Sequence, residues 1–267
     1  MPARPRDLAA QFFAYVQMRK LRVVRQGDLV RSVLGFTAEQ ERKLLSRLAR
    51  AKRIARVRRG LYLVPARPPI SGTWTPAEVL AINTLIADRK GRYQICGPNA
   101  FSRYGYSEQL PNRLYAYNNR ISGNRKVGAI SITLIKVADR RLGDTAEDKS
   151  DDGEVAVYAS RARTLFDAVY DWSRFGALPR AYEWIRADLA ARNVSASELI
   201  RVTLRYGDIG TIRRIGAVLE REGVDLHQLK PLSSKLRSAI NPLPMVPRRP
   251  RRGEVDPRWG VIWNDGD

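Results

Sequence analysis

Residues 37–64 read TAEQERKLLSRLARAKRIARVRRGLYLV and decide the fold of the first part of the chain. Thr37 and Gln40 have the spacing of a capping box, in which the Thr hydroxyl accepts a backbone N–H of the first helical turn and the Gln side chain reaches back to the start of the helix. Leucines recur at helical spacing after this box, so we predict a helix that runs to about Lys52. Its buried face is expected to contain Leu44, Leu45, Leu48 and Ala49.

The periodicity changes from helix to strand after Arg53. Residues 54–58 alternate apolar and basic side chains, Arg59-Gly60 has the composition of a turn, and residues 61–64 predict a returning strand. Two shorter amphipathic helices are predicted before this region, within residues 7–20 and 26–34, the second ended by Gly35. Three helices followed by a basic hairpin is the order of a winged helix-turn-helix, whose third helix enters the major groove of DNA.

The third helix and the hairpin supply the candidate DNA-binding residues. Arginine can donate two hydrogen bonds to guanine O6 and N7, so the helix is expected to face the groove, whereas the hairpin is expected to hold backbone phosphates. A helix with one basic face is often only solvated, but here it precedes a basic hairpin, and this combination favours DNA binding. The predicted set is Thr37, Gln40, Arg42, Lys43, Ser46, Arg47, Arg50, Arg53, Arg56, Arg58 and Arg59.

The distribution of charge agrees with this interpretation. The 267 residues include 48 Lys and Arg against 27 Asp and Glu, a formal net charge of +21. Residues 1–65 hold 16 basic and 4 acidic side chains, a net charge of +12, so the positive charge is concentrated in the first quarter of the chain. A surface this positive attracts polyanions, either nucleic acid or an anionic membrane face.

Several classes of protein are excluded by composition. The single cysteine, Cys96, and the single histidine, His227, rule out an internal disulfide and a metal site built from several cysteines or histidines. No apolar run approaches the length of a transmembrane helix, and the N-terminal residues lack the apolar segment of a signal peptide. We therefore expect a soluble, cytoplasmic protein that needs no cofactor or metal.

The pattern along the chain predicts an α+β fold in three parts. Residues 1–66 form the winged helix-turn-helix, and the prolines of residues 65–72 indicate a linker. Residues 67–240 form a larger α+β domain, with a short sheet first and a helical bundle from Ser160 onward. Residues 241–267 form a tail that is rich in proline and arginine. We interpret residues 241–257 as an extended basic arm rather than a packed element, and whether the tail contacts DNA, docks on the core or is disordered stays open.

Catalytic motifs are scarce in the sequence. No phosphate-binding loop of the Gly-x-x-x-x-Gly-Lys-Ser/Thr type is present, and Gly97-Pro98 is expected to have a packing role. An acidic stretch could hold a cation, but its lack of apolar residues beyond Ala146 favours a solvated loop; its members are Asp144, Glu147, Asp148, Asp151, Asp152 and Glu154. Arg163, Asp167 and Asp171 lie four residues apart on one face of a predicted helix, a spacing that predicts ion pairing within the helix, unless Asp167 caps a neighbouring element. We predict no catalytic residue and no enzyme.

Several motifs follow one another from the basic segment to about residue 240. They are Arg59-Gly60-Leu61-Tyr62, Gly97-Pro98-Asn99-Ala100-Phe101 with Tyr104-Gly105 and Gln109-x-Pro111, Ser160-Arg161-Ala162-Arg163-Thr164-Leu165-Phe166-Asp167, and Arg213-Arg214-Ile215-Gly216 with Leu219-Glu220. In order and spacing, this set resembles the AbiEi family of antitoxins. The resemblance implies a type IV toxin–antitoxin pair associated with phage defence. In it, an N-terminal winged helix-turn-helix represses its own operon at inverted repeats, and a C-terminal domain antagonises a nucleotidyltransferase toxin without a stable complex. It also implies a monomer that pairs on DNA.

Two other functions stay open from the residues alone. The first is an enzyme that processes nucleic acid and is targeted by the winged helix, with the acidic stretch as its only support. The second is an RNA-binding protein, which the net charge allows, although the sequence has neither the aromatic motif of RNA-recognition domains nor a Gly-x-x-Gly clamp. In the C-terminal part, the aromatic residues Trp172, Phe175, Tyr182 and Trp184 are expected to be core or, alternatively, a surface for a toxin.

Overall fold

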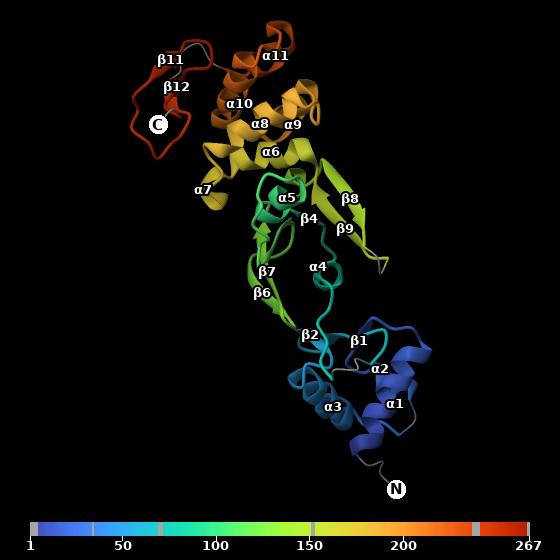
Figure 1. Cartoon of the computed structure of the whole chain (residues 1–267). Helices are drawn as coiled ribbons and strands as arrows, with labels where there is room; N and C mark the ends of the chain where they lie inside the picture. Colours follow the sequence, from blue (N-terminus) through green and yellow to red (C-terminus); the bar gives the residue numbers. More distant parts are fainter. Residues whose placement is uncertain (1–4, 34, 69–71, 151–152, 237–240, 266–267) are drawn as a thin grey trace. The chain divides into compact units, whose positions relative to one another are not determined.

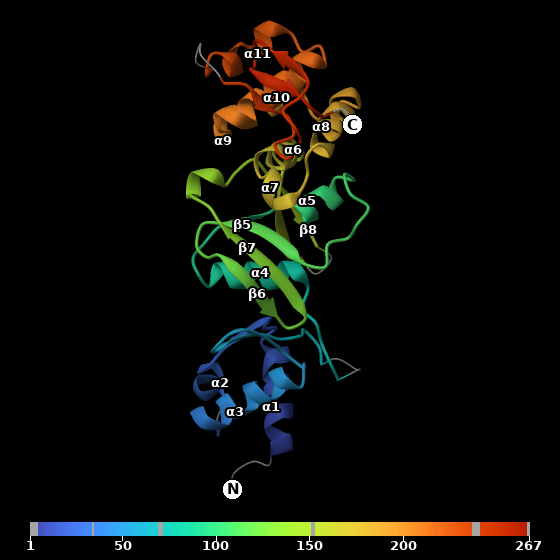
Figure 2. The same ribbon diagram turned by 90° about the vertical axis from the view of Figure 1, so that its left-hand side faces the viewer.

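The computed structural model describes residues 5–33, 35–68, 72–150, 153–236 and 241–265. Helices and several sheets are both present, so the predicted α+β class is confirmed. Two compact units divide the chain: the first holds residues 1–93, 112–137 and 149–156, and the second holds residues 94–111, 138–148 and 157–267 (Figures 1 and 2). The domain boundary at residue 66 stays a prediction. Within the described ranges, no helix is both long and apolar enough to cross a membrane.

The first unit begins with helices and a small antiparallel sheet. The capping box at Thr37 is confirmed, and it begins the third helix as predicted. The sheet has the order β1-β3-β2, and Val23 of β1 pairs with Leu63 of β3. The short strand β1 has no alternating pattern of its own, and sequence analysis missed it. The elements are α1 (Pro5–Met18), β1 (Val23–Arg25), α2 (Asp28–Ser32), α3 (Ala38–Arg50), β2 (Ala55–Arg58) and β3 (Leu61–Leu63).

A second sheet region completes the first unit. It contains α4 (Glu78–Ala87), β5 (Leu114–Asn118), β6 (Gly123–Val127) and β7 (Ile130–Lys136). Strand β7 pairs in parallel with β5 and forms an antiparallel hairpin with β6. The turn of this hairpin contacts β2, since a Cβ atom on Gly128 would lie 3.1 Å from the Cβ atom of Ala55. The β2–β3 hairpin is therefore supported by the rest of its own unit (Figure 1).

Strands β4 (Tyr93–Ile95), β9 (Val155–Ala159) and β8 (Thr145–Lys149) are consecutive in sheet order. Ile95 of β4 pairs in parallel with Tyr158 of β9. Strand β8 corrects the expectation of a solvated loop between Gly143 and Gly153. Its side chains are mostly exposed, so hydrogen bonding within the sheet, rather than apolar alternation, holds this segment in place.

A helical bundle from Ser160 onward forms most of the second unit, as predicted. Leu165, Tyr182 and Ile215 are fully or almost fully buried in its core. The last predicted helical segment extends over residues 237–240, which lie outside the described residues. The bundle contains α6 (Arg161–Tyr170), α7 (Trp172–Phe175), α8 (Arg180–Ala190), α9 (Ala196–Tyr206), α10 (Ile209–Arg221) and α11 (Leu226–Ser233). The same unit also holds α5 (Pro98–Arg103) and η1 (Asp139–Arg141), which precede the bundle in the chain.

The C-terminal segment packs on this bundle, so the expectation of an unpacked arm is wrong. Strands β10 (Leu243–Pro244), β11 (Glu254–Asp256) and β12 (Val261–Trp263) form a three-stranded sheet. Trp259 is completely buried against α10, where a Cβ atom on Gly216 would lie 2.2 Å from its ring. Because the segment is rich in proline and arginine, its composition does not indicate that a few apolar side chains anchor it.

Candidate nucleic-acid interface

Helix α3 begins with both side chains of its capping box in use. The backbone N–H of Gln40 donates to Thr37 Oγ1 at 3.2 Å, and the backbone N–H of Thr37 donates to Gln40 Oε1 at 2.9 Å. The buried face of the helix holds Leu44, Leu45 and Leu48, as predicted. The opposite face is therefore directed away from the core.

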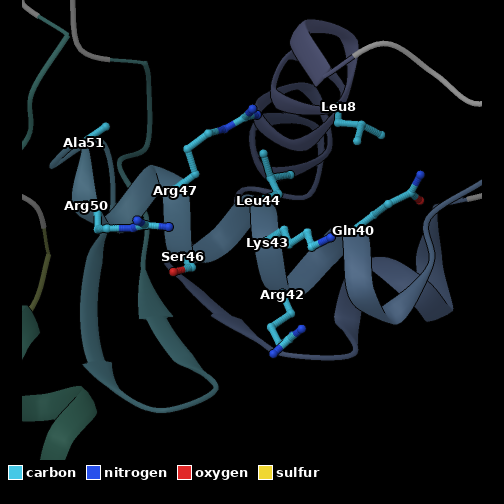
Figure 3. A pocket seen from close by; sticks show the side chains of 9 residues that line it. All are labelled: Leu8, Gln40, Arg42, Lys43, Leu44, Ser46, Arg47, Arg50 and Ala51. Carbon is cyan, nitrogen blue, oxygen red and sulfur yellow. The ribbon is translucent and has the colours of Figure 1, made fainter.

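The polar face of α3 lines a hollow of about 910 Å³. Figure 3 shows the side chains of this face on successive turns of α3, with Leu8 of α1 nearby. Arg42, Lys43, Arg47 and Arg50 are exposed. Lys43 Nζ lies 2.7 Å from Glu39 Oε1, but both side chains are more than three-fifths exposed, so water screens this pair. The structure thus brings together six predicted residues, Gln40, Arg42, Lys43, Ser46, Arg47 and Arg50.

Glu41 fixes the position of α3 against α2, and sequence analysis missed it. Its side chain is completely buried and accepts hydrogen bonds from the backbone N–H groups of Gly27 at 2.7 Å and Leu29 at 3.0 Å. Helix α2 starts after Gly27, which has a φ of 99° and offers no side chain to cap the helix. Glu41 supplies that cap from α3 and ties the two helices together. Its place three residues before Leu44 indicates that it lies on the buried face, but this spacing does not indicate its backbone partners.

The β2–β3 hairpin presents Arg56, Arg58 and Arg59 to solvent, although Arg58 is held by an acidic partner. Arg58 Nε and Nη2 each donate to a carboxylate oxygen of Asp88 at 2.6 Å, and Arg25 Nη1 donates to the same carboxylate at 3.2 Å. The hydrogen bonds from Arg58 lower the pKa of Asp88 to about 2. The pair joins the hairpin to the end of α4, so Arg56 and Arg59 are better placed than Arg58 to bind an external anion.

Arg53 has a different environment from the other predicted residues. It is half-buried, and its guanidinium lies 4.8 Å from the centre of the Phe13 ring. Such a cation–π contact stabilises the packing of α1 against the end of α3. The position of Arg53 therefore favours a packing role over a phosphate contact.

Strand β6 adds exposed basic residues to the same unit that sequence analysis did not select. Arg125 and Lys126 are exposed on this strand, whose hairpin contacts β2. The signal is the polar stretch Gly123-Asn124-Arg125-Lys126, which lacks an apolar pattern and is easily taken for a loop. Side chains here widen the basic surface of the first unit.

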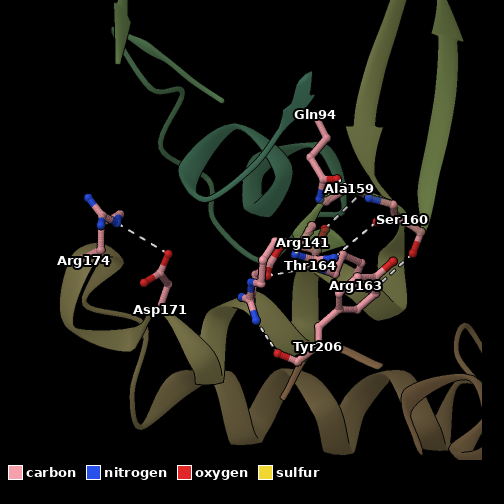
Figure 4. A network of polar contacts seen from close by, with 11 residues as sticks. Gln94, Arg141, Ala159, Ser160, Arg163, Thr164, Asp171, Arg174 and Tyr206 are labelled. Carbon is pink, nitrogen blue, oxygen red and sulfur yellow. Dashed lines mark hydrogen bonds and ion pairs between the residues drawn. The ribbon is translucent and has the colours of Figure 1, made fainter. Parts of the chain in front are cut away.

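The second unit contains a buried polar network around Arg163 (Figure 4). Arg163 and Asp167 are both 1% exposed, and Arg163 Nε donates to Asp167 Oδ1 at 2.9 Å, so the predicted ion pair within the helix is confirmed. Arg163 also donates to the carbonyl oxygens of Arg141 at 2.9 Å and Gly143 at 3.3 Å. Burial raises the pKa of Asp167 to about 6, against the opposing charge of Arg163. The donors of Arg163 are turned inward, so this network holds η1 and α6 together.

Asp171 was predicted on the same face as Asp167, but it lies just beyond the end of α6. Its carboxylate forms an ion pair with Arg174 Nε at 3.5 Å, at the start of α7 (Figure 4).

The acidic stretch does not gather into a metal site. Asp144 pairs with Arg201, Asp148 pairs with Arg103, and Glu154 accepts a hydrogen bond from Asn83 at 2.8 Å. Asp151 and Asp152 lie outside the described residues. Among the residues that are described, no three His, Cys, Asp or Glu side chains come together as metal ligands would.

The region of Gly97 and the nearby aromatic residues is closely packed. Gly97 has a φ of 57°, and a Cβ atom there would lie 2.4 Å from the Phe175 ring, which agrees with a packing role. Phe101 makes an edge contact with Phe175 at 5.9 Å and a tilted contact with Trp184 at 5.1 Å between ring centres. Tyr182 is 1% exposed and donates to the carbonyl oxygen of Met245 at 2.7 Å. These aromatic side chains contribute to the core of the second unit.

Comparison with known proteins places the chain in a family and identifies a fold. A family model described as a family of unknown function, DUF6088, matches residues 19–152. No curated protein matches the sequence. The crystal structure of the Rv2827c protein from Mycobacterium tuberculosis is similar, with a TM-score of 0.62, 13% sequence identity, and coverage of 95% of this chain and 90% of the other. At this identity the similarity concerns the fold alone.

Proposed function

We propose that this chain, which belongs to the DUF6088 family of unknown function, is a DNA-binding transcriptional repressor. In this proposal residues 1–66 are a winged helix-turn-helix, with α2 and α3 as the helix pair and the β2–β3 hairpin as the wing. The order of these elements supports it, as does the carboxylate of Glu41, which joins α2 to α3.

The observation that carries the proposal is the exposed basic face of α3. Arg42, Arg47 and Arg50 are exposed on α3 and line one hollow, an arrangement that suits a helix lying in a major groove. Arginine on such a face can read guanine, while Arg56 and Arg59 of the hairpin hold phosphates. The chain would occupy inverted repeats in its own promoter, one copy on each repeat, and exclude polymerase.

We further propose that the protein is an antitoxin of the AbiEi kind and acts in the cytoplasm. The support is the set of motifs that resembles that family, from Arg59-Gly60-Leu61-Tyr62 to Leu219-Glu220. Its partner would be a nucleotidyltransferase toxin, which the C-terminal part counteracts without forming a stable complex. The proposed role requires no catalytic residue.

A gel shift on the DNA upstream of the gene tests the repressor. Arg47→Glu/Arg50→Glu is expected to abolish sequence-selective binding. Arg140→Glu/Arg192→Glu, which changes the charge equally at two exposed positions of the second unit, should leave selectivity unchanged. Binding by the first variant equal to that of the unaltered protein would overturn the proposal. A salt series adds a second readout, the slope of the logarithm of the binding constant against the logarithm of the salt concentration. Six or more phosphate contacts would give a slope of about −5 or steeper.

Co-expression with a nucleotidyltransferase toxin, sought among the genes beside this one, tests the antitoxin. The unaltered chain is expected to restore growth, and Arg47→Glu/Arg50→Glu is expected to do so equally when both genes are driven by a foreign promoter. Failure of the unaltered chain to restore growth would remove the antitoxin role and leave the repressor role standing.

A further inference from the structure

The C-terminal sheet carries a loop with an unusual density of positive charge. Residues 247–252, between β10 and β11, read Pro-Arg-Arg-Pro-Arg-Arg, and we call them the arginine loop. The loop belongs to the second unit, whereas α3 and the β2–β3 hairpin belong to the first. It also lies outside the motifs that resemble a known family.

The backbone of the arginine loop is held by a buried side chain. Asn264 is 6% exposed, and its Nδ2 donates to the carbonyl oxygens of Val246 at 3.1 Å and Pro250 at 3.0 Å. Its Oδ1 accepts the backbone N–H of Val246 at 2.9 Å. Arg249 adds a hydrogen bond from Nη1 to the carbonyl oxygen of Asp265 at 2.9 Å. The backbone of the loop is therefore ordered before any ligand binds, so the loop loses less conformational entropy on binding.

The remaining arginines of the loop are directed to solvent. Arg251 and Arg252 are exposed, and Arg248 is exposed with its guanidinium 5.6 Å from the centre of the Trp172 ring. Over the described ranges, the ion pairs of this region involve other arginines, Arg258 with Glu220 and Arg186 with Glu222 and Asp265. Three like charges on one short loop repel each other, and an anion placed between them removes that repulsion.

The chemistry of the loop suits phosphodiester groups. A guanidinium donates two parallel hydrogen bonds to a phosphate, and its planar fork binds phosphate with more geometric specificity than an ammonium does. The loop itself contains only proline and arginine, and the neighbouring Trp172 ring is already in contact with Arg248, so the loop offers no aromatic ring of its own on which an unpaired base could stack. This composition favours the backbone of a duplex over single-stranded nucleic acid.

We propose that the arginine loop is a second DNA-binding site, which holds backbone phosphates of duplex DNA without reading sequence. The choice of DNA rests on the proposed function of α3, whereas the phosphate chemistry rests on the loop alone. The site gives the second unit its own affinity for DNA and increases the salt dependence of the whole protein.

Fluorescence anisotropy of the full chain with a labelled random-sequence duplex, over a salt series, tests the site. Arg251→Gln/Arg252→Gln is expected to weaken binding roughly fivefold to tenfold and to reduce the salt slope by about 2, one for each phosphate that the loop no longer holds. The matched control Arg140→Gln/Arg192→Gln has the same change in charge and should have a much smaller effect. Equal effects of the two variants would overturn the site, because long-range charge alone would then account for the weaker binding.

Two further variants test the shape of the loop and its independence from α3. Asn264→Ala leaves every arginine in place and is expected to weaken binding as well, and affinity equal to that of the unaltered chain would overturn the role of the preformed loop. The loop substitutions are also made in the Arg47→Gln/Arg50→Gln background, where they should still reduce the residual binding. A loop effect that persists while α3 substitutions change nothing would refute the repressor proposal alone. Loop-dependent binding of a labelled single-stranded RNA, without loop-dependent binding of the duplex, would overturn the assignment to DNA.

Discussion

The arginines of α3 and those buried in the second unit share one chemistry but have opposite surroundings. Arg42, Arg47 and Arg50 are exposed on a helix whose other face is leucine. Arg163 and Arg213 are 1% and 6% exposed, and they donate to carboxylate or carbonyl oxygens of their own unit. A net charge of +21 therefore overstates the charge that is available to a partner. Exposure and local hydrogen bonding decide which arginines are accessible to a partner.

The two groups of arginines also differ in how the guanidinium is oriented. Arg213 Nε donates to the carbonyl oxygen of Trp259 at 2.7 Å, and its Nη2 donates to that of Asn241 at 2.8 Å, so backbone oxygens fix it. Arg42 and Arg50 of α3 are exposed, so their guanidinium groups are accessible from solvent. The first arrangement stabilises the fold, and the second makes the guanidinium accessible to a ligand.

The largest effect is expected at the buried pair of α6. Asp167→Ala leaves the charge of Arg163 buried without its partner, and we expect the free energy of unfolding to fall by about 3–5 kcal/mol. Denaturation with urea, followed by tryptophan fluorescence, measures it. Because Arg163 keeps its hydrogen bonds to the carbonyl oxygens of Arg141 and Gly143, a decrease below about 1 kcal/mol would mean that these carbonyls alone compensate the charge.

A buried carboxylate of the first unit gives the next largest effect. Glu41→Ala leaves the backbone N–H groups of Gly27 and Leu29 without their acceptor, at a cost of about 2–3 kcal/mol. Because the same carboxylate joins α2 to α3, we also expect DNA affinity to fall. Urea denaturation and a gel shift on the same preparation measure the two effects. Glu39→Ala is the matched control, since Glu39 is exposed on the same helix and should change stability by less than about 0.5 kcal/mol. Equal stabilities of the two variants would contradict the capping role.

Much of the first unit could be predicted because its local signals agree with one another. The capping box of Thr37, the leucines of α3 and the Arg59-Gly60 turn all predict the same elements, and each is found. Glu41 could not be assigned, because its partners are backbone groups of another helix and have no signature in the sequence. The pairing of Arg58 with Asp88 escaped for a similar reason, since thirty residues separate them.

The errors in the rest of the chain have a common physical cause. Strand β8 and the C-terminal sheet are held by pairing with other strands and by a few anchors, such as Trp259. The composition of a segment gives its average polarity, but it does not predict where a single tryptophan side chain is buried. Of the candidate site, the basic face of α3 followed from periodicity, whereas the packing of Arg53 on Phe13 depends on tertiary structure.

The packing of Trp259 on α10 is tested by adding one methyl group at Gly216. Gly216→Ala places a Cβ atom 2.2 Å from the Trp259 ring and is expected to destabilise the protein by about 1–3 kcal/mol. Gly210→Ala is the control in the same helix, because the nearest atom to its Cβ position, in Arg214, is 3.5 Å away. The control should be neutral or stabilising by up to about 1 kcal/mol, through the helix propensity of alanine. Thermal unfolding compares the two, and equal midpoints would contradict the packing of Trp259 on α10.

The pH dependence of stability distinguishes the surface pair from the buried one. The pKa of Asp88 is about 2 in the folded chain and 3.8 when unperturbed, so its pair with Arg58 contributes stability above about pH 4 that is lost as the pH falls toward 2. The Arg58 side chain is 40% exposed, so we expect an effect below about 1 kcal/mol. The pH dependence of stability from Asp167 has the opposite sign. Its pKa is raised to about 6 in the folded chain, so its contribution to stability decreases as the pH rises from about 4 to 6. Denaturation at several pH values, with Asp88→Asn and Asp167→Asn, measures both slopes, and slopes of the same sign would contradict this difference between the two carboxylates.

The smallest change in stability is expected where the change in binding is large. Arg42→Ala and Arg50→Ala remove exposed side chains of α3, and each should change the free energy of unfolding by less than about 0.5 kcal/mol. Each should nevertheless weaken operator binding, by about 1–3 kcal/mol if the arginine contacts a guanine, or reduce the salt slope by about 1 if it contacts a phosphate. Urea denaturation and operator titration of the same preparation give both numbers. A variant that loses both stability and DNA affinity would show that the arginine stabilises the fold, as Arg163 does. An arginine that acts only in binding contributes little to the folded state, so its removal should lower the DNA affinity and leave the free energy of unfolding unchanged.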